Sequence, residues 1–407
     1  MTGGTADRIA AAMAALGDGP LTAAAIDRHV RPLFSRVLRE SGDRVYLANH
    51  SLGRPLDAMA ADIEEGMALW YARLGDAWEA WRAEIDAYRA RLAQLLGAPR
   101  PDAVIPKSSA GQGLRAVLNT YQTKARVVAT RGEFDSIDVI LREYARRQRI
   151  DLELIAAGSD GRFTAEAIGA ALDREVDLVV LSPVMFASAQ VLPDVRTLIA
   201  KAHAQGAKVV LDVYHMLGVM PDDVAALDAD FAIGGSYKYL RGGPGACFLY
   251  VHPRHLDAGL RTLDIGWFAK QDVFAYLRPD PPRYAPGGDG WMESTPAVLP
   301  FYQARAGQLF TLAVGVARQR TYSLEQQRQL IALLADHGVR AHGGHPLHGA
   351  FVTVRTADAQ RWVERLDGLG IAVDARGEWL RICPDVLTTH DELLRTANAM
   401  GALEPSG

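Results

Sequence analysis

Residues 205–245 have the sequence QGAKVVLDVYHMLGVMPDDVAALDADFAIGGSYKYLRGGPG, around which the rest of the chain is organised. Residues 208–213 are mostly β-branched and apolar, which predicts a buried strand that carries Asp212 near its end. A second apolar run at 231–235 leads to Lys238 and then to a glycine-rich turn. One acid and one lysine are therefore expected at neighbouring strand ends, the edge at which parallel sheets bind their ligands.

Asp212 and Lys238 suit the two protein groups that pyridoxal phosphate requires. A lysine amine forms a Schiff base with the cofactor aldehyde, and an acid beside the pyridine nitrogen keeps that nitrogen protonated, so the ring accepts electrons from the substrate Cα. The alternative is an aspartate that caps a turn and a lysine on the surface. The strand context, the flanking glycines and the adjacent Tyr237 favour the cofactor.

The composition is that of an ordinary soluble globular protein. Charged residues make up 23% of the 407 residues and hydrophobic residues 49%. The formal net charge of -4 gives no reason to expect nucleic acid as a partner. No stretch approaches about 18 uninterrupted apolar residues, and the N-terminus lacks a basic segment followed by an apolar core. We therefore expect no membrane partner and a cytoplasmic location.

Neither a disulfide nor a metal site is expected. Cys247 and Cys383 are the only cysteines, and both lie in apolar, strand-like runs that suit buried thiols in a reducing compartment. His342, His345 and His348 recur every third residue. The glycines and the proline between them predict an irregular turn instead of a helix face that could hold a metal.

Strands and helices alternate through the first two thirds of the chain. Apolar runs separated mainly by helical patterns predict an α/β domain with a mostly parallel sheet and right-handed crossovers. The seven predicted strands are residues 103–106, 126–129, 151–155, 178–181, 208–213, 231–235 and 247–251.

Small residues precede a helix that is predicted at 114–121. Segment 107–113 includes Ser108 and Ser109 and leaves backbone N–H groups free to meet an anion, and the helix dipole favours a phosphate there. A serine cap without a ligand is the alternative. Given the lysine and the acid, this segment is the expected phosphate site.

The C-terminal part predicts a second, smaller α+β unit. A helix at 301–319 is expected to be followed by another at 323–337, whose start, Ser-Leu-Glu-Gln, has the form of a capping box. A last helix should begin after Thr389, and single helices are expected at 21–39 and 56–96. We expect two domains, a large one of residues 50–300 and a small one of residues 1–49 together with 301–407.

The motifs of the chain, in their order, resemble those of the fold-type I pyridoxal-phosphate enzymes, within them the class V aminotransferases, and most closely the kynureninases. The resemblance extends from Tyr46 to Pro384. It rests on NHSLGRP at Asn49, LSPV at Leu181, LDVYH at Leu211, SYKYLRGGPG at Ser236, IGWF at Ile265, Ser294-Thr295-Pro296, and WLRICP at Trp379.

This resemblance implies a role for each of several residues. Lys238 would hold the cofactor and move the Cα proton, Asp212 would pair with the pyridinium nitrogen, and Tyr237 would help to deliver a proton to Cβ. Phe134 would stack on the ring. Arg381 would hold the substrate α-carboxylate, for which its forked guanidinium is suited, and a strand-surface ion pair is the alternative.

Further residues are implied in cofactor and substrate binding by the same resemblance. Ser108, Ser109, Tyr237, Trp267 and Thr295 would bind the phosphate, Trp267 and Thr295 from the second subunit of a homodimer. The other implied residues are Ser136, Ser182 and His215 around the cofactor and Asn49 and Ser51 in the substrate loop.

The implied reaction is the hydrolytic cleavage of the Cβ–Cγ bond of kynurenine to alanine and anthranilate. The chain departs from the family pattern where the aromatic end of the substrate would bind. Residues 71–81 contain no histidine, Ala269 and Lys270 follow Gly-Trp-Phe, and Thr295 stands where an asparagine is common.

Other activities are compatible with the same motifs. They are a class V aminotransferase, or a C–S or other lyase, that acts on a different amino acid, and a non-catalytic protein that binds pyridoxal phosphate. A cysteine desulfurase is not expected, because it needs a nucleophilic cysteine in a mobile loop and neither cysteine lies in one.

Overall fold

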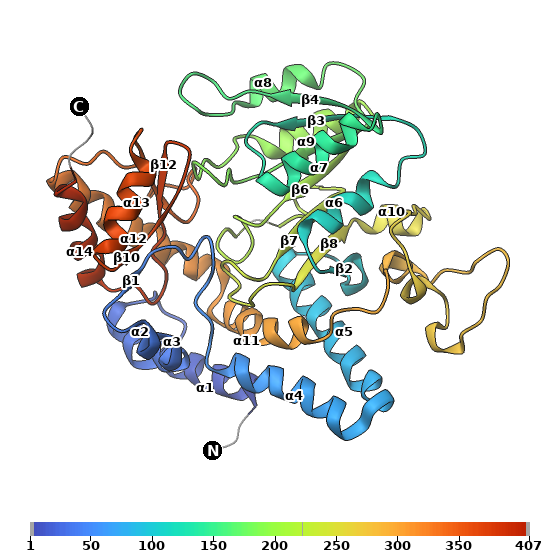
Figure 1. Cartoon of the computed structure of the whole chain (residues 1–407), viewed down its shortest axis with the longest axis horizontal. Coiled ribbons are helices and arrows are strands. Elements are labelled where there is room, and N and C mark those ends of the chain that lie inside the picture. The colour runs from blue at the N-terminus through green and yellow to red at the C-terminus, as the bar shows by residue number, and fades with distance from the viewer. Residues whose placement is uncertain (1–3, 222, 404–407) are drawn as a thin grey trace.

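The central element is a seven-stranded sheet (Figure 1). The computed structural model describes residues 4–221 and 223–403. The strands are β2 (Val104–Lys107), β3 (Ala125–Thr130), β4 (Ile150–Ile155), β5 (Leu178–Leu181), β6 (Lys208–Asp212), β7 (Phe231–Gly235) and β8 (Cys247–Val251). Their order is β2-β8-β7-β6-β5-β3-β4, in which β8 is antiparallel to both neighbours and every other pair is parallel. The predicted α/β fold with a mostly parallel seven-stranded sheet is confirmed.

The sheet forms the core of the molecule, and its inner strands are buried on both faces. Every residue of β5, β7 and β8 is buried, as expected for apolar runs covered by helices. The helices that link or flank the strands are α5 (Ala77–Leu96), α6 (Ala110–Leu118), α7 (Asp135–Arg146), α8 (Ala165–Ala171), α9 (Val195–Ala204) and α10 (Pro253–Asp257). Helix α6 packs on β7 and β8, and α9 packs on β6.

The strand register brings the chemically important residues to one edge of the sheet. Lys107 of β2 and Gly235 of β7 both pair with Cys247, the first residue of β8. Asp212, the last residue of β6, pairs with Ile233 of β7. The C-terminal ends of the parallel strands therefore meet at this edge, and the segments that follow them carry Ser108, Phe134, Ser182 and Lys238.

A smaller unit is built around a three-stranded antiparallel sheet of order β11-β12-β9. Its elements are β9 (Val352–Arg355), α13 (Ala359–Gly368), β10 (Ile371–Ala372), β11 (Asp374–Arg376), β12 (Trp379–Ile382) and α14 (His390–Gly401). Strand β1 (Val45–Tyr46), from the N-terminal part, pairs with β10. The unit has its own hydrophobic cluster, which includes Val45, Leu330 and Leu380. The division into domains of residues 50–300 and of 1–49 with 301–407 remains a proposal.

In three regions the long helices predicted from the sequence are divided differently in the structure. Residues 21–39 form α2 (Ala23–His29), a 3-10 turn (Arg31–Phe34) and α3 (Ser35–Ser41). Residues 56–96 form α4 (Ala58–Arg73) and α5, separated at Leu74, whose φ is 48°. Gly315, with φ 86°, ends α11 (Leu299–Val314) and α12 (Val316–Asp336) follows at once. The predicted helix start at 323 is therefore wrong. The predicted start of the last helix after Thr389 is confirmed, and Thr389 and Glu392 form a capping box there.

Two further features concern the whole described chain. The N-terminal helix α1 (Thr5–Leu16) packs against α2 and α11, and residues of all three helices belong to a third hydrophobic cluster. Within residues 4–221 and 223–403, the structure contains no helix with the length and apolar character needed to cross a membrane. Cys247 and Cys383 are free and buried, as expected.

Candidate active site

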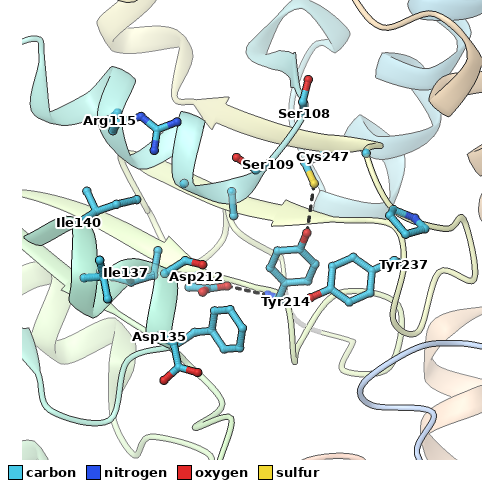
Figure 2. Close-up of a pocket in the computed structure, with 17 residues that line it drawn as sticks. Ser108, Ser109, Arg115, Asp135, Ile137, Ile140, Asp212, Tyr214, Tyr237 and Cys247 are labelled. Atoms are coloured by element: carbon cyan, nitrogen blue, oxygen red, sulfur yellow. Dashed lines mark hydrogen bonds between the residues drawn. The ribbon is translucent and has the colours of Figure 1, made fainter.

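A cavity of about 600 Å³ opens at the edge where the strands end (Figure 2). Figure 2 shows Ser108, Ser109 and Arg115 above Asp212, Tyr214 and Tyr237 in this view. The cavity is lined by six of the predicted cofactor residues, Ser108, Ser109, Phe134, Ser136, Asp212 and Tyr237. A small adjoining space shares Phe134, Asp212 and Tyr237 and is also lined by Ser182, His215 and Lys238. One chain therefore gathers nine predicted residues at a single place.

Lys238 is buried at the inner end of this site. Its Nζ lies 2.8 Å from Nε2 of His215 and 5.3 Å from the centre of the Phe134 ring. Burial lowers the pKa of Lys238 to about 7, although the nearby charge of Asp212 opposes the shift. A substantial fraction of the amine is therefore neutral near pH 7, the form in which an amine attacks an aldehyde.

Asp212 is a buried acid that faces the cavity. Its Oδ1 accepts a hydrogen bond of 3.0 Å from the backbone N–H of Tyr214. Burial raises the pKa of Asp212, while this hydrogen bond and the charge of Lys238 act in the opposite direction. A cation placed against this carboxylate would offset the cost of burying its charge, and a protonated pyridine nitrogen is such a cation.

The start of α6 forms the other end of the cavity. Oγ of Ser109 caps the helix by accepting from the N–H of Gln112 at 3.2 Å, and the N–H of Ser108 donates to Oε1 of Gln112 at 2.7 Å. The positive end of the helix dipole points here. With an amine, a buried acid, an aromatic ring and a helix start around one cavity, the residues present fit pyridoxal phosphate.

Trp267 and Thr295 lie outside this cavity within one chain. Nε1 of Trp267 donates to Oγ1 of Thr295 at 3.2 Å, and Trp267 lines a different surface cavity, with Tyr276. The structure therefore does not bring these two residues to the other phosphate residues of the same chain.

The three predicted substrate residues lie together beyond His215. Arg381 is buried, and its Nε and Nη2 donate to Asp374 at 2.7 and 2.6 Å while Nη1 donates to the carbonyl oxygen of Phe186. Ser51 donates to the same carboxylate of Asp374. Nδ2 of Asn49 donates to the carbonyl oxygen of Cys383 at 2.8 Å. Arg381 thus has a buried ion pair, and it does not line the main cavity.

Sequence reasoning missed several residues of the site. His50, inside the NHSLGRP motif, bonds to Asp374 through Nε2 at 2.7 Å and stacks on Phe351. Tyr214, inside LDVYH, lines the cavity, and its hydroxyl lies 3.1 Å from Sγ of Cys247. Both residues belong to motifs that the sequence already shows, so the predicted site residues beside them could have indicated that they lie in the site.

Glu133 is the missed residue with the most unusual environment. Its Oε2 accepts from Oγ of Ser182 at 2.6 Å, and its Oε1 lies 2.7 Å from Oγ1 of Thr130. Burial raises the pKa of Glu133 to about 7, against the effect of these hydrogen bonds. It directly precedes Phe134, and its hydrogen bonds tie the end of β3 to Ser182, which follows β5.

Comparison with known proteins places this fold and site in a family. Residues 56–384 match the family model Aminotransferase class-V, and the chain belongs to that family. Kynureninase from Deinococcus radiodurans is 30% identical over 365 residues, which cover 85% of this chain and 84% of that protein. Kynureninase from Geobacillus thermodenitrificans is 27% identical over 395 residues, covering 89% and 90%. Within the class V family, the chain belongs with the kynureninases.

Solved structures with lower sequence identity share the fold. A C-DES mutant with glycine linked covalently to its PLP cofactor has a TM-score of 0.82 and 17% identity, covering 92% of this chain and 99% of that chain. The cysteine desulfurase from Thermococcus onnurineus NA1 has a TM-score of 0.75 and 18% identity, covering 88% and 94%. These similarities establish the fold-type I architecture.

Proposed function

We propose that this protein is a pyridoxal-phosphate-dependent hydrolase that cleaves the Cβ–Cγ bond of L-kynurenine or a related amino acid, giving alanine and an aromatic acid. The observation that best supports this proposal is the buried, partly neutral amine of Lys238 beside the cavity-lining Asp212, in a chain that belongs with the kynureninases. When bound, the cofactor withdraws electrons from the substrate Cα.

The protein's own groups have distinct tasks in this proposal. Lys238 holds the cofactor and takes the Cα proton, and Asp212 keeps the pyridine nitrogen protonated. Burial raises the pKa of Tyr237 to about 12, so its phenol keeps its proton at neutral pH and can donate it to Cβ. Phe134 stacks on the ring, while Ser136, Ser182 and His215 surround it.

Arg381 is the proposed partner of the substrate α-carboxylate. Asp374 and the carbonyl of Phe186 occupy three of its five N–H groups. Of the other two N–H groups, one on Nη2 lies 3.4 Å from Oγ of Ser51, a long hydrogen bond that a substrate carboxylate can replace. Asp374 would hold the guanidinium in place, and Asn49 and Ser51 flank that position.

The proposed assembly is a homodimer in which Trp267 and Thr295 reach the phosphate of the partner subunit. Their place outside the cavity of their own chain supports this arrangement. Exposed aromatic side chains on the surface, such as Tyr71 and Tyr276, at 82% and 68% exposed, also suit a protein contact. We propose a cytoplasmic location, which suits the two free, buried thiols.

Product analysis tests the reaction directly. The holoenzyme is incubated with L-kynurenine and with 3-hydroxykynurenine, and alanine and the corresponding anthranilates are measured. We expect both products from at least one substrate and none with Lys238→Ala, which should also lose the absorbance of the lysine-linked cofactor. No product from either substrate would overturn the proposed substrate class. Conversion of the cofactor to its amine form by an amino acid alone would indicate an aminotransferase.

A further inference from the structure

Arg115 is the only arginine or lysine among the described residues that line the 600 Å³ cavity. It lies in α6, is half-buried, and shares the cavity wall with Ser108 and Ser109. Its guanidinium forms no hydrogen bond or ion pair within the described part of the chain. A half-buried cation that lines a cavity and has no protein partner suits an anionic ligand in that cavity, because the ligand would compensate for the hydration that the cation has lost.

The proposed phosphate residues leave a need for positive charge. Ser108, Ser109 and Tyr237 are neutral hydrogen-bond donors, as are the side chains expected from the partner subunit. A phosphate monoester carries about -1.5 to -2 charges at pH 7, and a helix start offers only about +0.5. Lys107, which directly precedes the serines, is already paired with Glu293 at 2.5 Å. Among the described residues that line the cavity, Arg115 alone offers a full positive charge to this end.

The position of the guanidinium fits a phosphate at the start of α6. Side chains in a helix lean toward its N-terminus, so Arg115 lies over Gly111, four residues earlier. Nη1 of Arg115 and Oγ of Ser109 lie 3.5 and 3.8 Å from the one point that a Cβ on Gly111 would occupy. A tetrahedral phosphate with hydrogen bonds of about 2.8 Å on two sides spans such a gap.

We infer that Arg115 binds the phosphate of pyridoxal phosphate and supplies the counter-charge that the hydroxyl donors lack. This inference rests on the cofactor site of the proposed function. It makes Arg115 a determinant of cofactor affinity, acting on the phosphorylated form of the cofactor and not on pyridoxal itself.

Reconstitution of the full chain tests this inference. Cofactor is removed from the wild type and from Arg115→Met, and dissociation constants for pyridoxal phosphate and for pyridoxal are measured from the absorbance of the lysine-linked species. We expect Arg115→Met to weaken pyridoxal phosphate binding about tenfold or more and to leave pyridoxal unchanged. Inorganic phosphate should compete with the cofactor in the wild type and compete less in the variant. Arg115→Lys should lie between the two.

Arg318→Met is the matched control, because Arg318 is another half-buried arginine that lies outside the cavity, and its Nε and Nη2 have no hydrogen-bond partner in the described structure. It should bind both compounds like the wild type, and thermal melting of the cofactor-free proteins checks that all variants are folded. Equal ratios of the two dissociation constants in the wild type and Arg115→Met would overturn the inference alone. A wild type that forms no lysine-linked species would overturn the cofactor site and the inference with it.

Discussion

Glu133 shows how one buried carboxyl can couple the candidate site to pH. Its pKa is raised to about 7 by burial, whereas a glutamate in the unfolded chain titrates near 4.5. Between these values the folded protein holds a proton that the unfolded chain has lost, so this group lowers the free energy of unfolding as pH rises. The decrease that this group causes in the free energy of unfolding is therefore largest above pH 7.

Glu133→Gln should remove this dependence, because the amide keeps the hydrogen bonds to Ser182 and Thr130 without a titrating proton. Relative to the variant, the wild type is expected to lose on the order of 2 kcal/mol between pH 5 and 8. Urea unfolding of the cofactor-saturated proteins at several pH values measures this difference.

Glu143→Gln, on the exposed side of α7, is the control. Arg146 and Arg147 lower the pKa of Glu143 to about 2, so the titration of this group changes stability at pH values below 5 and not between pH 5 and 8. Parallel stability profiles for the wild type and Glu133→Gln would contradict the prediction.

Residue chemistry was predictable where a motif fixed both position and type. Asp212 and Lys238 follow apolar runs whose strand ends are evident in the sequence, and the register places them at one edge. Glu133 and Arg115 were missed for a common reason. An isolated acid or cation in a helical pattern is usually solvated, and only the assembled fold shows that Glu133 is buried and that Arg115 lines the cavity. Glu133 meets Ser182, which is 49 residues away in the sequence.

Elements were predictable where apolar patterns dominate and less so where a break depends on one backbone angle. The bounds of β5, β7 and β8 agree with the prediction residue for residue. The start of α12 differs from the prediction, because the capping pattern at Ser323 lies inside a continuous helix. There, Oγ of Ser323 accepts from Nε2 of Gln327. A cap needs an extended residue before the helix, and Gly315 provides the actual break.

Thr389 provides the contrasting case of a working cap. Its Oγ1 accepts from the N–H of Glu392 at 3.2 Å, and Oε2 of Glu392 accepts from the N–H of Thr389 at 2.6 Å. Thr389→Ala should therefore cost about 1 kcal/mol of stability, measured by chemical denaturation. In the described structure the hydroxyl of Thr321, inside α12, donates to the carbonyl oxygen of Ala317 in the same helix. Thr321→Ala should therefore change stability by no more than about 0.5 kcal/mol. Equal effects of the two substitutions on stability would show that the capping box at the start of α14 adds no stability of its own.

At the scale of the whole molecule, the active site is expected to need two chains. Between α10 and α11 a long segment projects from the body of the protein (Figure 1). It carries Trp267, which stacks on Tyr276 with ring centres 6.1 Å apart, and a bridge between Lys270 and Tyr284. These contacts join parts of the segment to one another, and Trp267 does not line the cavity of its own chain. In the proposed homodimer, the second subunit would provide a phosphate site for it.

Mixing two inactive variants distinguishes a shared site from a site within one chain. In a mixed dimer of Lys238→Ala and Trp267→Ala, one site combines an intact Lys238 with the intact Trp267 of the other subunit. Random exchange makes half of the dimers mixed, each with one complete site, so roughly a quarter of wild-type activity should return. Lys238→Ala mixed with Asp212→Ala should recover none, because both residues come from the same chain and each site then lacks one of them. Subunit exchange is confirmed with tagged chains, and exchange without recovery in the first pair would place Trp267 outside the partner's site.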